Sequence, residues 1–288
     1  MRIAFPLSAK PSEKKEKNRH RQLQDEEIHP SFDCMAEKEN SDRVVLIAGI
    51  SGGIGSDLAA RFVEDGWKVA GFGRSQEKLD KLTEDHSGIS TYEADACDSK
   101  AVGDVVEKVL EEHGQIDAYV HCVGSFLLKP AHSTSDEEFE ETLLLNLQTA
   151  FYGLRAVVKP MMKSDGGTIT LVSSVASLAG LPSHEAIAAA KGGINGLVRS
   201  AASSYANKGI RVNAVAPGMV ETELSKGLLG SDMARQMATQ MHPVGRIGKP
   251  GDIASLLFWL SQPENSWVTG QVWSVDGGVA DVNQRVKV

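Results

Sequence analysis

A run of glycines directly after a short apolar segment is the first feature whose residue types and spacing could do chemistry. The apolar segment covers residues 44–48, and Gly49, Gly53 and Gly55 follow it in the pattern Gly-x-x-x-Gly-x-Gly. A helix is expected to start in this turn, and the backbone N–H groups and positive dipole end of a helix N-terminus attract a pyrophosphate. Glycine permits the tight turn and a close approach of phosphate to backbone. The turn is therefore a candidate nucleotide-binding site.

The elements that must position this turn are short apolar runs alternating with helical stretches. Apolar runs of this kind are typical of parallel strands buried on both faces. Strands are expected at residues 44–48, 68–72, 89–92, 116–120, 168–172, 210–216 and 271–275. Helices are expected at 58–65, 76–83, 100–113, 185–207 and 250–261, and a long helix pair at 136–162. The alternation implies right-handed crossovers. It predicts an α/β fold: one doubly wound parallel sheet of the Rossmann type, in three α/β/α layers within a single domain.

The beginning of the chain differs from the rest. Residues 1–34 mix seven basic with six acidic side chains and show little apolar periodicity. Such a stretch cannot bury enough surface to offset its ordering entropy, so we expect disorder there. It has no apolar stretch of signal-peptide length. The predicted division is an N-terminal tail or extension at residues 1–41 and a Rossmann-type domain at residues 42–288.

Composition excludes several classes of function. The net charge of −8 disfavours binding to nucleic acid or to an anionic membrane surface. The three cysteines, Cys34, Cys97 and Cys122, are too few and too scattered for a disulfide framework. No apolar run approaches bilayer-spanning length, and no Cys/His cluster has metal-ligand spacing. We expect a cytoplasmic protein without a metal site, a nucleic-acid partner or a membrane partner.

Several segments together resemble the short-chain dehydrogenase/reductase family, in particular its single-domain branch of 3-oxoacyl-ACP reductases. The segments that carry the resemblance are the glycine turn, Asp95-Ala96-Cys97-Asp98, His121-Cys122-Val123-Gly124, Asn146, Ser173-Ser174, Pro217-Gly218-Met219-Val220-Glu221-Thr222, Val268-Thr269-Gly270-Gln271 and Asp276-Gly277-Gly278. The resemblance covers residues 42 to 280. One departure is that His121-Cys122-Val123-Gly124 stands where the family usually has Asn-Asn-Ala-Gly.

The resemblance implies a nicotinamide cofactor, and charge favours NADP(H) over NAD(H). An acid at the end of the second strand would repel a 2′-phosphate, whereas this chain has Gly73 followed by Arg74 and Ser75. Arg74 can pair with a phosphate and Ser75 can donate a hydroxyl. The alternative is that Arg74 simply begins a solvated helix. The candidate cofactor-binding residues are Gly49, Ser51, Gly53, Ile54, Gly55, Arg74, Ser75, Asp95, Ala96, Cys122, Gly124, Lys191, Pro217, Gly218, Val220 and Thr222.

The resemblance also implies a catalytic set with one member missing. Ser174 matches the family's carbonyl-orienting serine, Lys191 its lysine and Asn146 its helix asparagine. The tyrosine that exchanges the proton should stand four residues before Lys191 and thirteen after Ser174. Both counts reach Ile187, which has no proton to give. His184, three residues earlier, is a candidate substitute acid because it lies close to one helical turn away. The alternative is that His184 is a surface residue near a helix start.

Three interpretations of this set stay open. In the first, the chain is a reductase whose proton comes from His184, from Lys191, or from a water held by Ser174 and Asn146. In the second, it binds NADP(H) without turnover, as a sensor, scaffold or partner subunit. In the third, it transfers hydride only to centres that need no protonation there. The retained serine, lysine and asparagine favour an oxidoreductase acting on carbonyl or alcohol groups.

Residues 222–246 indicate the kind of substrate. Apolar side chains recur around and within this stretch: Met219, Leu224, Leu228, Leu229, Met233, Met237 and Met241. The resemblance places a mobile substrate loop here, and methionines adapt to variable ligands. A plain amphipathic lid helix explains the pattern equally well. We expect a small, apolar carbonyl or alcohol substrate. The resemblance further implies a homodimer or homotetramer through the helices around Asn146 and Lys191 and the C-terminal strand.

Overall fold

The structure, a computed structural model, describes residues 38–282 of the 288-residue chain. Over this range seven parallel strands form one sheet in the order β3-β2-β1-β4-β5-β6-β7. The strands are β1 (Val44–Ala48), β2 (Lys68–Gly73), β3 (Ile89–Glu93), β4 (Ala118–His121), β5 (Gly167–Val172), β6 (Ile210–Pro217) and β7 (Val272–Val275). The strand order reverses between β1 and β4, and ligands of open α/β sheets bind at the carboxyl ends of strands at such a point.

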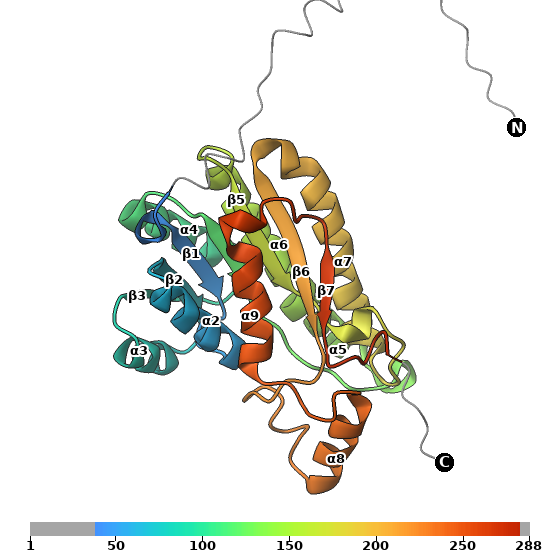
Figure 1. Ribbon diagram of the computed structural model, residues 1–288. Helices are drawn as coiled ribbons and strands as arrows, with labels where there is room; N and C mark the ends of the chain where they lie inside the picture. Colours follow the sequence, from blue (N-terminus) through green and yellow to red (C-terminus); the bar gives the residue numbers. More distant parts are fainter. Residues whose placement is uncertain (1–37, 283–288) are drawn as a thin grey trace, which may run out of the picture.

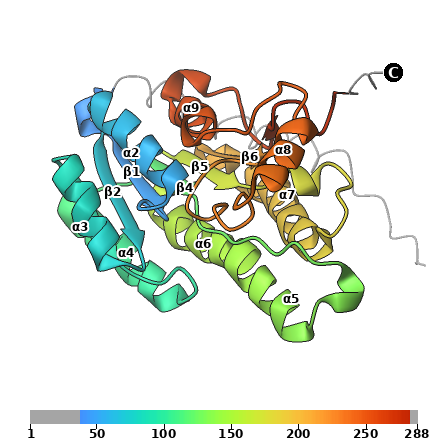
Figure 2. The ribbon, with the colours of Figure 1, turned by 90° about the horizontal axis from the view of Figure 1, so that it is seen from below.

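Helices cover both faces of the sheet (Figures 1 and 2). They are α2 (Gly53–Glu64), α3 (Gln76–Asp85), α4 (Ser99–His113), α5 (Asp136–Leu143), α6 (Thr149–Met161), α7 (Glu185–Tyr205), α8 (Asp232–Met241) and α9 (Pro250–Ser261). The side chains of α2, α3 and α9 pack into one apolar core, and those of α4, α6 and α7 pack into the other. Every residue of β1 is fully buried, because alternate side chains enter the two cores. The predicted three-layer doubly wound fold is confirmed.

Some element boundaries differ from the expected ones, because backbone hydrogen bonds determine where a helix begins and ends, whereas the prediction used apolar periodicity. Helix α2 begins at Gly53, inside the glycine turn, five residues before the expected start. The helix pair expected at 136–162 is present as α5 and α6, which are joined by a π-helical turn, Leu144–Gln148. Helix α8, within the segment expected to form a lid, projects beyond the carboxyl ends of the strands (Figure 1).

The expected N-terminal tail lies outside the described residues apart from residues 38–41, and so do residues 283–288 of the expected domain. Within that short piece, Lys38 Nζ donates to the side chains of Gln115 and Asp117, at 3.2 Å each, and Asn40 donates to Asp65 at 3.1 Å. No helix between residues 38 and 282 is long and apolar enough to cross a membrane.

Candidate functional site

The turn after β1 is held in a shape that requires glycine at two positions. Gly49 has a φ of +76°, in the left-handed region, and its N–H donates to the Phe72 carbonyl of β2 at 2.9 Å. A Cβ at Gly55 would lie 2.3 Å from the Gly49 carbonyl oxygen, so no larger residue fits there. The first N–H groups of α2 have no partner within the helix and face outward at its N-terminus. The turn therefore presents bare backbone donors where a phosphate can approach.

These glycines form one wall of a cleft of about 850 Å³ at the carboxyl ends of the strands. We call it the glycine-lined cleft. Its expected residues are Gly49, Ser51, Gly53, Ile54, Gly55, Arg74, Asp95, Ala96, Cys122, Gly124 and Thr222, and its further lining includes Gly73, Lys78, Lys81, Asp85, Ser125, Leu145 and Glu223. Gly53 faces Thr222, and a Cβ there would lie 3.0 Å from the threonine methyl group. The loops after β1, β4 and β6 thus border one space.

The end of β2 carries the positive charge of this cleft. The side chain of Arg74 is exposed there, and Lys78 and Lys81 of α3 line the same space. Ser75 caps α3, because its hydroxyl oxygen accepts from the Lys78 N–H at 3.4 Å. The two lysines are functional candidates that sequence reasoning missed. Their spacing of three residues on a helix that begins directly after Arg74 was the available signal.

Asn146 lies in the middle of the π-helical turn and is fully buried. Its Oδ1 accepts from the Ser125 N–H at 3.0 Å, while its Nδ2 donates to the Ser125 hydroxyl at 2.9 Å and to the Thr142 carbonyl at 3.0 Å. A Cβ at Gly124 would lie 2.9 Å from Asn146 Oδ1, so the loop after β4 closes directly against this amide. Asn146 therefore fixes the loop that borders the glycine-lined cleft.

Lys191, on α7, points into the interior beside that loop. Its Nζ donates to the Val172 carbonyl at 2.8 Å, and a Cβ at Gly124 would lie 3.4 Å from it. Burial lowers the pKa of Lys191 to about 8. Burial also raises the pKa of the Cys122 thiol to about 12, which keeps it protonated. Among the residues that the structure describes, the ammonium thus has no carboxylate partner; it lies at the end of β5, just before Ser173 and Ser174.

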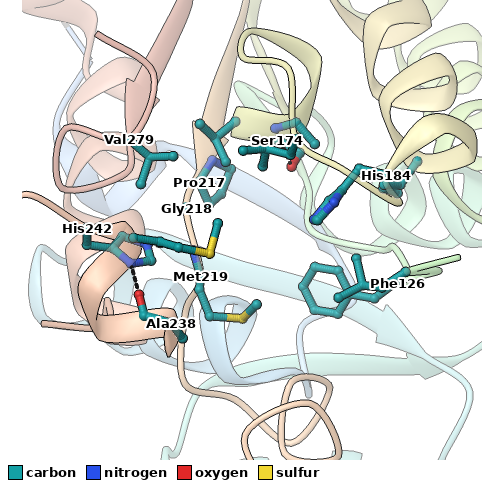
Figure 3. A pocket seen from close by; sticks show the side chains of 15 residues that line it. Phe126, Ser174, His184, Pro217, Gly218, Met219, Ala238, His242 and Val279 are labelled. Atoms are coloured by element: carbon teal, nitrogen blue, oxygen red, sulfur yellow. Dashed lines mark hydrogen bonds between the residues drawn. The ribbon is translucent and has the colours of Figure 1, made fainter. Parts of the chain in front are cut away.

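A second space, the apolar pocket, adjoins the cleft. Its lining is Phe126, Leu128, Ser174, Val175, Ala176, Leu181, His184, Ile187, Pro217, Gly218, Met219, Ala238, Met241, His242 and Val279 (Figure 3). Gly124 and Ser125 line the cleft and Phe126 lines the pocket, so the loop after β4 separates the two. The Ser174 hydroxyl oxygen accepts from the Ala176 N–H at 3.2 Å, which leaves its own proton for a ligand. Ile187 is 2 % exposed and adds a hydrocarbon surface beside it.

His184 reaches this pocket from the turn that starts α7. Ser183 has a φ of +61°, which is strained for a residue with a side chain, and it turns the chain into the helix. The imidazole Nδ1 lies 2.7 Å from the Pro182 carbonyl oxygen, an acceptor, so Nδ1 carries a proton. Nε2 is then the nitrogen left for the pocket, toward which the ring points (Figure 3). The structure brings His184, Ser174 and Ile187 to one pocket.

His242 stands on the opposite side of the pocket and was not among the predicted site residues (Figure 3). Its Nδ1 donates to the Ala238 carbonyl of α8 at 2.6 Å, and its Nε2 accepts from the Met219 N–H at 3.1 Å. A Cβ at Gly218 would lie 2.7 Å from this Nε2. The ring therefore ties α8 to the loop after β6, and both ring nitrogens are occupied. Sequence spacing offers no signal for this contact.

The remaining candidates lie apart from the cleft lining. Pro217 and Gly218 line the apolar pocket, Lys191 lies beneath the loop after β4, and Ser75 serves as a helix cap. Val220 is buried and forms a β-bridge with Gly248. Between residues 38 and 282, no group of three His, Cys, Asp or Glu side chains could hold a metal ion.

Comparison with known proteins agrees with this architecture. Residues 49–280 match the family model described as "Enoyl-(Acyl carrier protein) reductase". The chain is 35 % identical over 241 residues to 3-oxoacyl-[acyl-carrier-protein] reductase FabG of Thermotoga maritima, which covers 82 % of this chain and 97 % of the relative.

Solved structures agree as well. ElxO with NADP bound superposes with a TM-score of 0.78 at 30 % identity, covering 82 % of this chain and 98 % of that one. Levodione reductase superposes with a TM-score of 0.79 at 30 % identity, covering 84 % and 99 %. The chain therefore belongs to the short-chain dehydrogenase/reductase family of oxidoreductases.

Proposed function

We propose that the chain is an NADP(H)-dependent oxidoreductase that exchanges hydride with a small, apolar carbonyl or alcohol substrate. The glycine-lined cleft fits a dinucleotide, because its wall is bare backbone at the N-terminus of α2. Gly73 leaves space at the end of β2, where a Cβ would lie 2.9 Å from Ser51 Oγ, and Arg74, Lys78 and Lys81 supply positive charge for a 2′-phosphate. When bound, the nicotinamide supplies or accepts the hydride.

The observation that carries the proposal is the meeting of Ser174 and His184 in one otherwise apolar pocket beside the cleft. In our proposal Ser174 donates a hydrogen bond to the substrate carbonyl oxygen. His184 exchanges the proton through Nε2 while Pro182 holds its Nδ1–H. Asn146 holds the loop after β4 at the cofactor ribose, and Lys191, held by the Val172 carbonyl, lies beneath that loop. Among the described residues, the lining contains no Lys, Arg, Asp or Glu, which favours an uncharged, apolar substrate.

Ile187 favours a second candidate function, NADP(H) binding without turnover as a sensor, scaffold or partner subunit. The experiment that separates the two combines binding and turnover on the full chain. Titration of NADPH and NADH should give tighter binding of NADPH, and NADPH should be oxidised with members of a panel of apolar ketones and aldehydes. Tighter binding of NADH contradicts the cofactor assignment. NADPH binding without oxidation by any carbonyl supports the sensor.

His184→Asn tests the proton donor, because an asparagine amide can still donate to the Pro182 carbonyl but has no Nε2. We expect kcat to fall by ~10²–10⁴-fold, the usual contribution of a positioned proton donor, with unchanged NADPH affinity. The matched control is His132→Asn, at an exposed histidine on another loop, which should leave kcat unchanged. Equal activity of the two variants would show that the proton comes from another group.

A further inference from the structure

A buried polar chain lies behind the loop after β4 and has no part in the proposed chemistry. It consists of Tyr119 and His121, on the same face of β4, and Thr149, at the start of α6; none is more than 1 % exposed. The Tyr119 hydroxyl lies 2.9 Å from His121 Nδ1, and His121 Nε2 lies 3.1 Å from Thr149 Oγ1. Buried polar groups with full sets of partners specify one local arrangement.

The direction of these hydrogen bonds follows from their last member. The Thr149 hydroxyl donates to the Leu145 carbonyl at 2.9 Å, so its oxygen accepts from His121 Nε2–H. His121 Nδ1 then accepts from the Tyr119 hydroxyl. The ring is neutral, because burial, and then the charge of Lys191, lower the pKa of His121 to about 3. Gly153 makes the space for this arrangement, since a Cβ there would lie 1.8 Å from the Tyr119 oxygen.

Thr149 also closes the π-helical turn. Its N–H donates to the Leu144 carbonyl, five residues back, and not to Leu145 as in an α-helix. The Thr149 hydroxyl donates to the Leu145 carbonyl instead. The π-helical register therefore depends on the side chain of Thr149, and His121 holds that side chain in place.

The register matters because Asn146 lies inside this turn. Asn146 bonds both the N–H and the hydroxyl of Ser125, and Leu145 and Ser125 line the glycine-lined cleft. A shift of the turn by one residue would rotate the Asn146 amide by about 100° around the helix axis and release the loop. The contacts thus connect His121, at the end of β4, to the wall of the cleft through Thr149 and Asn146.

We infer that His121 and Thr149 are positioning residues for the nicotinamide half of the cofactor site, an inference that rests on the proposed function. They hold the π-helical turn, which holds Asn146 and the loop after β4 at the ribose next to the nicotinamide. The adenine half, at Arg74 and the glycine turn, does not depend on them. The two halves of the cofactor should therefore respond differently when the Thr149 hydroxyl is removed.

The test measures the affinities of the full chain for NADPH and for adenosine 2′,5′-bisphosphate, which occupies the adenine half alone. Thr149→Val removes the hydroxyl and keeps the shape. It should weaken NADPH binding about tenfold, because the two buried hydrogen bonds of the hydroxyl are lost, and leave the bisphosphate affinity unchanged. Thr149→Ser restores a hydroxyl and should restore NADPH affinity.

Thr170→Val is the matched control. The Thr170 hydroxyl, on β5, is buried and has no hydrogen-bond partner, so its loss should leave both affinities unchanged. If Thr149→Val lowers the affinities for both ligands equally, the network has only a structural role and the inference is overturned. Unchanged NADPH affinity would also overturn it.

A second measurement needs no cofactor. The side-chain amide protons of Asn146 should exchange slowly with solvent in the parent chain and in Thr149→Ser, and faster in Thr149→Val. Equal exchange rates in the parent chain and in both variants would overturn the inference. Failure of the parent chain to bind NADPH contradicts the proposed function instead, and amide exchange then decides the inference alone.

Discussion

Ile187 stands where the family resemblance leads us to expect a proton-exchanging tyrosine, one helical turn before Lys191. It is 2 % exposed, so any larger side chain there adds a packing cost of about 1–3 kcal/mol. Ile187→Tyr supplies a phenolic proton in the pocket that holds Ser174, and Ile187→Phe supplies the same ring without it. Carbonyl reduction should be at least about tenfold faster in Ile187→Tyr than in Ile187→Phe. Equal rates of NADPH oxidation in the two variants would mean that the substrate oxygen does not reach residue 187.

Lys191 provides a residue-scale prediction for stability. Its pKa is about 8 in the folded chain, against an ordinary value of 10.5. Between these values the unfolded chain holds more protons, so stability should rise as the pH rises from 8 to 10.5. Lys191→Met removes the buried charge and should raise the free energy of unfolding at pH 7 by about 1–2 kcal/mol, with a smaller gain at pH 10. Urea unfolding at both pH values measures this, with the exposed Lys159→Met as the control. A loss of stability at pH 7 would contradict the prediction.

At the scale of elements, α8 contributes no side chain to either apolar core. It buries only Ala238, while Met233 and Met237 are 72 % and 61 % exposed. The methionines of this region divide between two environments, since Met219 and Met241 line the apolar pocket while Met233 and Met237 face outward. Among the described residues, α8 is tied to the loop after β6 by the histidine at its C-terminal end and by the ion pair between Arg235 and Glu221, at 2.7 Å.

His242→Phe keeps an aromatic ring at this position and removes both hydrogen bonds of the imidazole. Trypsin should then cut the segment at residues 222–246 faster than in the parent chain, because local opening requires less free energy. The thermal midpoint of the whole chain should change little. His132→Phe, at an exposed position, is the control and should leave the cleavage rate unchanged. Unchanged cleavage in His242→Phe would mean that other contacts hold the lid.

The π-helical turn shows where element prediction from sequence stops. Apolar periodicity correctly predicted helix across most of residues 136–162, because the buried face of α6 repeats at helical spacing. The extra residue in the turn leaves that periodicity almost unchanged. The π-helical register is set instead by a hydrogen bond from the Thr149 hydroxyl and by one from His121, which lies 28 residues away in the sequence. The departure at His121 from the family's usual asparagine was visible in the sequence, but its contact was not.

At the scale of the whole molecule, the fold was predictable and the site only in part. Strands buried on both faces appear in sequence as apolar runs, and glycines mark the turn where a side chain would collide with backbone. Contacts such as that between His242 and Met219 depend on where a distant loop returns and on one side-chain rotamer. Neither follows from spacing. The family's motifs therefore predict which strand ends meet, while packing decides what each side chain touches there.

The expected self-association is the prediction for the molecule as a whole. On the helices expected to form subunit contacts, Phe151 of α6 is 43 % exposed. Ala150, Ala201 and Ala202, on the same helices, are buried within the domain. At one edge of the sheet, β7 pairs with β6 alone among the described strands, and Trp273 on β7 is 42 % exposed. Two separate surfaces of this kind suit a homotetramer.

Light scattering during size-exclusion chromatography tests both surfaces. We expect a tetramer for the parent chain, and a dimer for both Phe151→Glu and Trp273→Glu, because a charge at either surface is costly to bury. The double variant should be a monomer with the circular dichroism of the parent chain. The control is Met233→Glu, at an exposed position of α8 away from both surfaces, and this variant should stay tetrameric. A parent chain that elutes as a monomer would contradict the prediction, and a single variant that stays tetrameric would exclude its surface from the assembly.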